Sequence, residues 1–205
     1  MAFDHLFWGY KQVANGILVE GLEGYKDDWK ISEGVDLSAE FPSDAYFAMN
    51  PEFPDSTIPT DHVRNQNNFV VISERLKQLL EAHGVKDVQY LQVGIKDHKG
   101  KLVSAPHFIV NPTRQVACFD EAQSEPTFSD LDEDKIEKME AFVPDDEVCK
   151  DLPDVVRPKG FYHLLISRSL AKKIDAAGMT GSGYVEPDRL LGDDIPVSLR
   201  GLTRK

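Results

Sequence analysis

The side chains best suited to chemistry are an Asp–His pair and two candidate nucleophiles. Asp97 and His98 are adjacent, and such a pair could act as a base oriented by a carboxylate, with Ser104 or Cys118 as the nucleophile. Asp97 also opens the sequence Asp97-His98-Lys99-Gly100, in which aspartate is a common turn former. The pattern favours a surface turn. We therefore predict no catalytic residues and no enzymatic activity, and keep an enzyme using Asp97 and His98 as an alternative.

The remaining motifs predict neither a metal site nor a phosphate site. The six histidines form no HxxxH or HxH pair, and the two cysteines form no CxxC pair. The glycine-rich sequence Gly181-Ser182-Gly183 lacks the lysine that follows a phosphate-binding loop, and it comes after a helix pattern. It predicts a flexible turn into a strand at Tyr184. We expect no metal and no cofactor.

Two segments, 70–91 and 164–185, share one pattern with an offset of 94 residues. Each begins with an apolar run typical of a buried strand, followed by a serine that can cap a helix. Each then has apolar residues at helical spacing, a glycine typical of a helix end, and a second strand with a tyrosine. The matching positions are Ser73 and Ser167, Gly84 and Gly178, and Tyr90 and Tyr184. We predict a duplicated strand-helix-strand unit that forms the scaffold.

The rest of the chain divides into regions around these units. Residues 1–65 are rich in aromatic residues and turn formers, which predicts short strands and loops packing on a core made elsewhere. Residues 66–119 hold the first unit and a hairpin turning at 97–100. Residues 120–155 form an acidic connector, and residues 156–205 hold the second unit and a tail ending in 200–205. We predict one compact α+β domain.

The acidic connector is expected to be partly helical. Its apolar residues follow near-helical spacing, and they are Leu131, Ile136, Met139 and Phe142.

Composition indicates a soluble globular protein. The chain has 205 residues, of which 41% are hydrophobic, and no apolar run approaches the roughly 20 residues that span a bilayer. The first residues lack the basic and apolar regions of a secretory leader, and two cysteines fit a reducing compartment. We expect a cytoplasmic protein.

Negative charge is concentrated in one segment. Between Asp120 and Asp154 there are fourteen acidic residues and three lysines, a net charge of −11 in a chain whose total is −12. Such a field repels nucleic acid and anionic lipid and speeds encounter with a basic protein. We hypothesise that Asp130, Asp132, Glu133 and Asp134 belong to a partner-binding surface. A solvated connector that only keeps the protein soluble is the alternative.

Several short segments of the sequence resemble a known protein family. They are residues 69–77, 88–93, 96–100 and 108–112, and later 161–167 with Ala176-Ala177-Gly178. They are similar to the bacterial immunity-protein family numbered eleven among the immunity proteins of polymorphic toxin systems, formerly catalogued as a domain of unknown function. The resemblance covers residues 40–187, and its motifs are structural.

This resemblance implies a binding protein without catalytic residues. Its partner would be a cognate toxin or effector domain, neutralised in the cytoplasm, with no nucleic-acid or membrane partner. Besides the Asp97/His98 enzyme, an acidic nucleic-acid mimic or adaptor with several basic partners stays open. The chemistry of the toxin and the oligomeric state are not assigned by the sequence.

Overall fold

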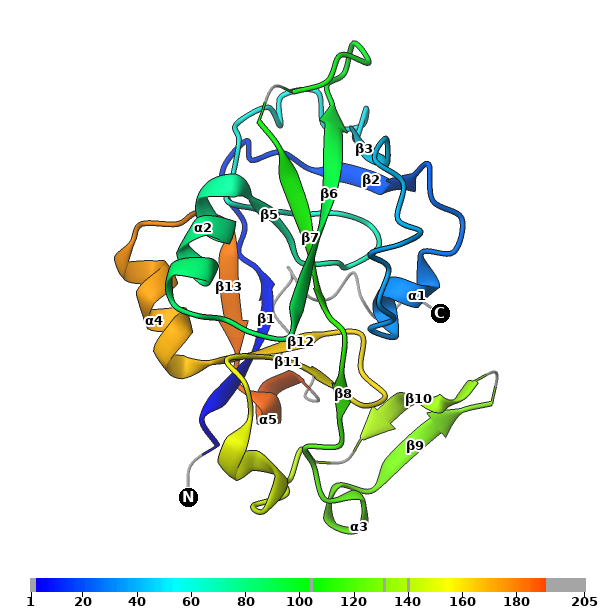
Figure 1. The fold of residues 1–205 in the computed structure, drawn as a ribbon, viewed down its shortest axis with the longest axis vertical. Coiled ribbons are helices and arrows are strands. Elements are labelled where there is room, and N and C mark those ends of the chain that lie inside the picture. Colours follow the sequence, from blue (N-terminus) through cyan, green and yellow to red (C-terminus); the bar gives the residue numbers. More distant parts are fainter. Residues whose placement is uncertain (1–2, 104, 131, 140, 191–205) are drawn as a thin grey trace.

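The computed structural model describes residues 3–103, 105–130, 132–139 and 141–190 (Figure 1). Six of the described strands form one sheet, in the order β2 (Val19–Glu23), β3 (Tyr46–Met49), β6 (Val88–Lys96), β7 (His107–Pro112), β5 (Val71–Ser73) and β4 (His62–Val63). Five form a second sheet, in the order β13 (Ser182–Val185), β1 (His5–Tyr10), β12 (Leu164–Ser167), β11 (Val155–Pro158) and β8 (Gln115–Val116).

The remaining strands, β9 (Pro126–Ser129) and β10 (Asp132–Met139), form a hairpin. The helices are α1 (Trp29–Ser32), α2 (Glu74–Ala82), α3 (Glu121–Ser124), α4 (Arg168–Ala176) and α5 (Pro187–Leu190), with a 3₁₀ turn at Val148–Asp151. This combination confirms the α+β class. None of the described helices has the length and apolar character needed to cross a membrane.

The six-stranded sheet curls until its two edges are joined. Backbone N–H groups of Ile17 and Val19, at the entry to β2, donate to the carbonyl groups of Ile58 and Arg64 beside β4, both at 2.9 Å. The joined edges satisfy backbone groups that would otherwise be open to pairing with another chain. The concave side is filled by a hydrophobic core that includes Val19, Phe47, Val71, Ile95 and Ile109.

The two predicted strand-helix-strand segments have the same local structure. The side chains of Ser73 and Ser167 accept the N–H groups of Leu76 and Leu170, both at 3.2 Å, and so cap α2 and α4. Gly84 and Gly178 follow these helices with φ of 75° and 65°. In each unit an antiparallel strand lies between the other two, β7 in the first and β1 in the second. An origin by duplication stays a prediction.

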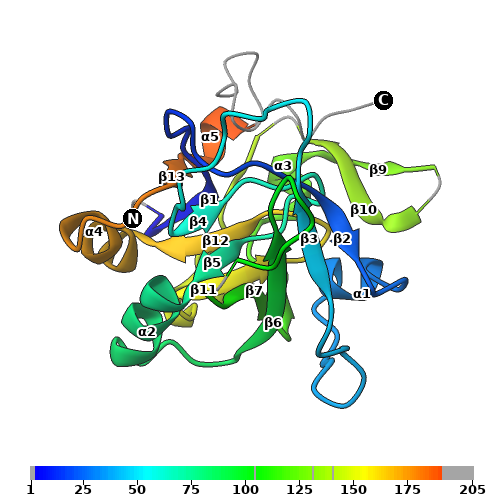
Figure 2. The same ribbon diagram turned by 90° about the horizontal axis from the view of Figure 1, so that it is seen from above.

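The two helices share one core. Leu76 and Leu80 of α2 and Leu170 and Ile174 of α4 are buried in the same cluster as Trp8. Figures 1 and 2 show α2 and α4 next to each other on one side of the molecule. The helices therefore bury the outer face of the curled sheet and one face of the five-stranded sheet together.

The N-terminal region does more than pack on a core made elsewhere. Strand β1 is hydrogen-bonded to β12 and β13, so it lies inside the five-stranded sheet. Within β1, the consecutive residues Phe7 and Trp8 are both 1% exposed. Their side chains face opposite sides of the sheet and pack in two different hydrophobic cores. This strand completes the second unit, as β7 completes the first.

The helical expectation for the middle of the acidic connector is wrong. Ile136 and Met139 lie in β10, and the described helical turns are α3 and 148–151, toward the ends of the segment. The register of β10 against β9 shifts twice, and extra residues in β10 break the two-residue alternation of a regular strand. This places buried Lys135 and Met139 four residues apart, a spacing that resembles a helix. Leu131 and the tail residues 200–205 lie outside the described residues.

Candidate functional site

Asp97, the carboxylate of the pair considered for catalysis, lies in a surface turn. One carboxylate oxygen of Asp97 accepts the backbone N–H groups of Lys99 and Lys101 at 2.8 and 2.9 Å, and these bonds lower the pKa of Asp97. His98 is exposed in the same turn, which closes the β6–β7 hairpin as predicted. Ser104 lies outside the described residues. The Asp97 carboxylate thus shapes the turn.

Cys118 is an unsuitable nucleophile in this environment. Its side chain is fully buried in a cluster with Phe119, Phe142 and Phe161, and burial raises the pKa of its thiol to about 12. Cys149 donates to the carbonyl oxygen of Cys118 at 3.1 Å, and burial raises its pKa to about 11. Since the thiolate is the reactive form, neither side chain is activated. No group of three or more potential metal ligands occurs among the described residues.

The four acidic residues assigned to a partner surface lie at the tip of the β9–β10 hairpin and along β10. Asp130 follows β9, and Asp132, Glu133 and Asp134 are the first three residues of β10. The side chains of Asp130 and Glu133 are exposed. In Figures 1 and 2 the hairpin extends on the side opposite to α4. The chain thus places these positions on one projecting element.

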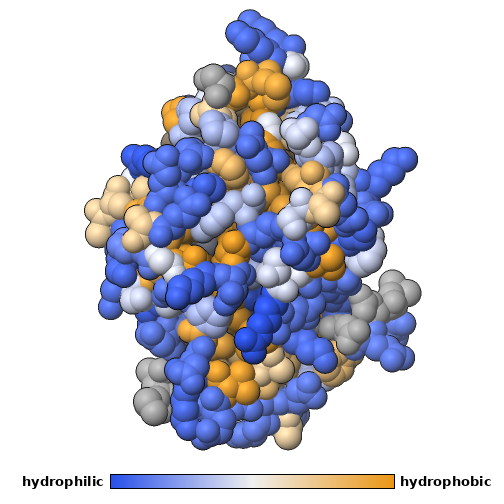
Figure 3. Space-filling view, in the orientation of Figure 1, coloured by the Kyte–Doolittle hydropathy of each residue, from blue (hydrophilic) through white to orange (hydrophobic). Residues whose placement is uncertain are grey.

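Two of the three lysines in this segment, Lys135 and Lys150, already interact with other side chains. Lys135 is only 9% exposed, and its Nζ lies 3.8 Å from Glu33 and 5.3 Å from the centre of the Tyr162 ring. Lys150 pairs with Glu147 at 2.6 Å. Exposed acidic residues of the segment include Glu121, Glu125, Asp130, Glu133, Glu137, Asp146, Glu147 and Asp151. The surface seen in Figure 3 is largely hydrophilic, with small apolar groups between charged side chains.

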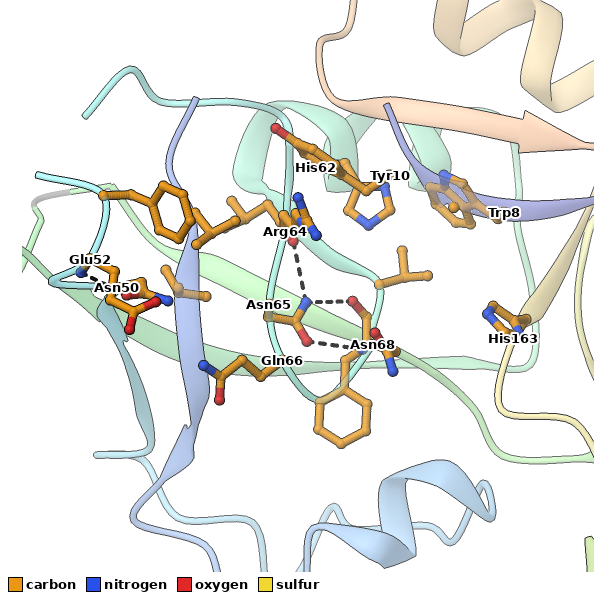
Figure 4. A pocket seen from close by; sticks show the side chains of 17 residues that line it. Trp8, Tyr10, Asn50, Glu52, His62, Arg64, Asn65, Gln66, Asn68 and His163 are labelled. Atoms are coloured by element: carbon orange, nitrogen blue, oxygen red, sulfur yellow. Dashed lines mark hydrogen bonds between the residues drawn. The ribbon is translucent and has the colours of Figure 1, made fainter. Parts of the chain in front are cut away.

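A pocket of about 590 Å³ lies where β1, β2 and β4 meet (Figure 4). Its aromatic lining consists of Trp8, Tyr10, Phe53 and Phe69. Its amide side chains are Asn50, Asn65, Gln66 and Asn68, and the charged and titratable ones are Glu52, His62, Arg64 and His163. In Figure 4, Trp8, Tyr10 and His62 lie on one side and Asn65, Gln66 and Asn68 on the other. Sequence reasoning missed this site because its residues come from several distant segments with no common motif.

The two histidines of the pocket are held uncharged. His62 is 3% exposed and packs edge-on against Trp8 and Tyr10, with ring centres 5.9 and 6.0 Å apart. Burial lowers its pKa to about 3 and that of His163 to about 4. Nδ1 of His62 and Nε2 of His163 are buried and have no hydrogen-bond partner in the part of the chain that the structure describes.

The floor of the pocket is rigidly built, whereas its mouth is open. The Asn65 amide donates to the carbonyl oxygens of Val63 and Phe69 and accepts the Phe69 N–H, which fixes the loop between β4 and β5. Arg64 forms no ion pair with the described residues, and Phe53 is 48% exposed. Amides, neutral imidazoles and aromatic rings provide hydrogen bonds and packing, so this arrangement is suited to binding.

Comparison with known families gives a match over most of the chain. The family model described as Immunity protein family (Imm11) matches residues 21–187. No curated protein matches the chain in sequence.

Proposed function

The chain belongs to the Immunity protein family (Imm11), and from this membership we propose that it binds and neutralises a cognate toxin or effector domain in the cytoplasm of the cell that makes both. The protection is stoichiometric: the protein occupies the toxin and performs no reaction of its own. The commitment of Asp97 to a turn and the buried state of Cys118 support a protein that acts by binding.

The observation that carries this proposal beyond family membership is the acidic hairpin. A projecting element with exposed carboxylates, in a segment where Lys135 is buried and Lys150 is paired with Glu147, attracts a basic protein surface from a distance. Charges at an interface rim raise the association rate more than they raise affinity. We therefore assign Asp130, Asp132, Glu133 and Asp134 to the first encounter with the toxin.

The proposal is tested first by survival. The protein is co-expressed with the toxin domain encoded by the adjacent gene, and growth and co-purification are measured. We expect growth to be rescued and a stable complex to form. A toxic neighbour that still kills the cells, with no complex recovered, would contradict the proposal for that pair.

The role of the hairpin is tested by a pair of matched variants. In the first, Asp130, Asp132 and Asp134 become Asn and Glu133 becomes Gln. The control neutralises four exposed acids elsewhere, changing Asp44, Asp55, Asp87 and Asp175 to Asn. Both variants lose the same net charge, so only the position of the charge differs.

We expect the hairpin variant to associate about tenfold more slowly than wild type at low salt and to lose most of the salt dependence. The control should change the rate far less. Equal effects of the two variants would show that net charge acts without a dedicated surface. Binding to unrelated basic proteins with similar strength would instead indicate a general acidic mimic.

A further inference from the structure

The pocket between β1, β2 and β4 presents an aromatic wall that begins at the protein surface. Phe53 is half-exposed at its edge, and Trp8 is almost fully buried within it. Partly exposed aromatic side chains beside a concave surface are typical of the centres of protein interfaces. A ring entering from outside would exchange water for contact with Phe53 and the apolar lining.

The same pocket contains hydrogen-bonding atoms without partners. Nδ1 of His62 and Nε2 of His163 are buried and unpaired among the described residues. Most buried polar groups in proteins are hydrogen-bonded, and each exception costs free energy. A neutral imidazole has one donor and one acceptor nitrogen, so a hydroxyl or N–H group that reached either ring would remove part of this cost.

Arg64 adds a cation that the fold leaves available. The chain contains 35 acidic residues, yet Arg64 forms no ion pair with those the structure describes. Arg75 and Arg168, by contrast, pair with Asp61 and Glu186. An unpaired guanidinium lies favourably over the face of an aromatic ring. Arg64 also stands at the centre of the pocket residues in Figure 4.

We propose that this pocket receives a tyrosine or tryptophan side chain of the toxin, which packs against Phe53 and Arg64 and hydrogen-bonds to His62 or His163. The inference rests on the proposed function and adds the second half of its interface. Tyrosine and tryptophan combine a large apolar ring with one polar group, and they dominate the binding energy of many interfaces. In this proposal the hairpin determines the association rate of the toxin, and the pocket determines its dissociation rate.

Two pocket variants and one control test this division. Phe53→Ala and Arg64→Gln each remove one contact with the incoming ring, and both side chains are partly exposed, so the fold should be retained. Leu102→Ala removes a similarly exposed apolar side chain, 56% exposed, that does not line this pocket. Unchanged melting temperatures verify that the three variants fold.

Binding kinetics with the toxin domain from the adjacent gene give the answer. We expect each pocket variant to dissociate about tenfold faster or more, with association changed by less than about twofold. Leu102→Ala should behave as wild type. A wild-type complex whose dissociation is unaffected by both pocket variants would overturn the inference and leave the proposed function intact.

A second readout observes the pocket directly. The chain has two tryptophans, so Trp29→Phe leaves Trp8, which lines the pocket, as the single tryptophan of this chain, and the spectrum of the free toxin domain is subtracted. We expect toxin binding to shift the emission of Trp8. When Phe53→Ala is added to the Trp29→Phe variant, a higher toxin concentration should be needed to produce half of this shift. Emission that stays unchanged in a formed complex would contradict occupancy of the pocket. If wild type forms no complex, the proposed function fails and this inference fails with it.

Discussion

Asp61 and Thr180 join the two strand-helix-strand units through one carboxylate. The backbone N–H and the hydroxyl group of Thr180, which follows α4, donate to Oδ2 of Asp61 at 2.8 and 3.1 Å. The same carboxylate accepts the Ser73 hydroxyl at 2.9 Å and forms two hydrogen bonds with Arg75, at the start of α2. A partly buried charge with this many partners fixes the relative position of the units.

Asp61→Asn should destabilise the protein by about 2–3 kcal/mol, because Arg75 loses its charged partner and the amide cannot accept all of these bonds. Urea denaturation at pH 7 measures the loss. Asp55→Asn, at an exposed position, is the control and should change stability by less than about 0.5 kcal/mol. Equal stability of the two variants would show that the Asp61 network contributes nothing.

Gly181→Ala should be much more damaging than Gly178→Ala. At Gly181 a Cβ would lie 2.2 Å from the carbonyl oxygen of His62, and φ is +83°. At Gly178 φ is +65°, but no atom lies within 4 Å of the added Cβ. We expect a loss of about 1 kcal/mol at Gly178 from backbone strain, and about 3 kcal/mol or more at Gly181. Denaturant midpoints of the two variants check this, and similar losses would contradict the close approach.

Local structure followed from local residues. Ser73 and Ser167 predict helix starts, Gly84 and Gly178 predict helix ends, and 97–100 predicts the hairpin turn, because each effect involves neighbours in sequence. The insertion of β1 between β12 and β13 could not be predicted in this way. It depends on pairing across more than 150 residues, for which the sequence of β1 contains no distinct signal.

The two candidate sites differ in the same way: the acidic hairpin comes from one continuous segment, whereas the pocket comes from residues far apart in sequence. The acidic hairpin was visible as composition, although its strands were obscured by irregular register in β10. The sequence did not reveal the pocket, because Trp8, Arg64 and His163 line one cavity only when the two sheets meet. Nothing in the sequence around His62 predicts that its side chain is buried. Its uncharged state results from packing against Trp8 and Tyr10.

Acid should weaken the fold through His62 and His163. Burial lowers their pKa values to about 3 and about 4, below the value of 6.5 for an exposed histidine. The unfolded chain therefore binds protons first, so stability is highest above pH 6.5 and falls as the pH decreases below it. At pH 5 each histidine should cost roughly 2 kcal/mol relative to pH 7.

His62→Phe tests this linkage, since it keeps an aromatic ring and removes the proton-binding group. The variant should lose roughly 2 kcal/mol less than wild type between pH 7 and pH 5. Comparing each protein with itself at pH 7 removes any packing difference from the result. Parallel curves of stability against pH for the two proteins would show that His62 is not held neutral.

Ser73→Ala and Ser167→Ala should each destabilise the protein by about 1–2 kcal/mol. Each serine caps a helix and also donates a hydrogen bond to the aspartate immediately before the preceding strand, Asp61 before β4 for Ser73 and Asp154 before β11 for Ser167. Combining each with Asp61→Asn separates these roles. Ser73→Ala should couple to it by about 0.5 kcal/mol or more, because the two side chains are in contact, whereas Ser167→Ala should be additive. Additive losses in both double mutants, measured by urea denaturation, would show that the Ser73–Asp61 bond is energetically silent.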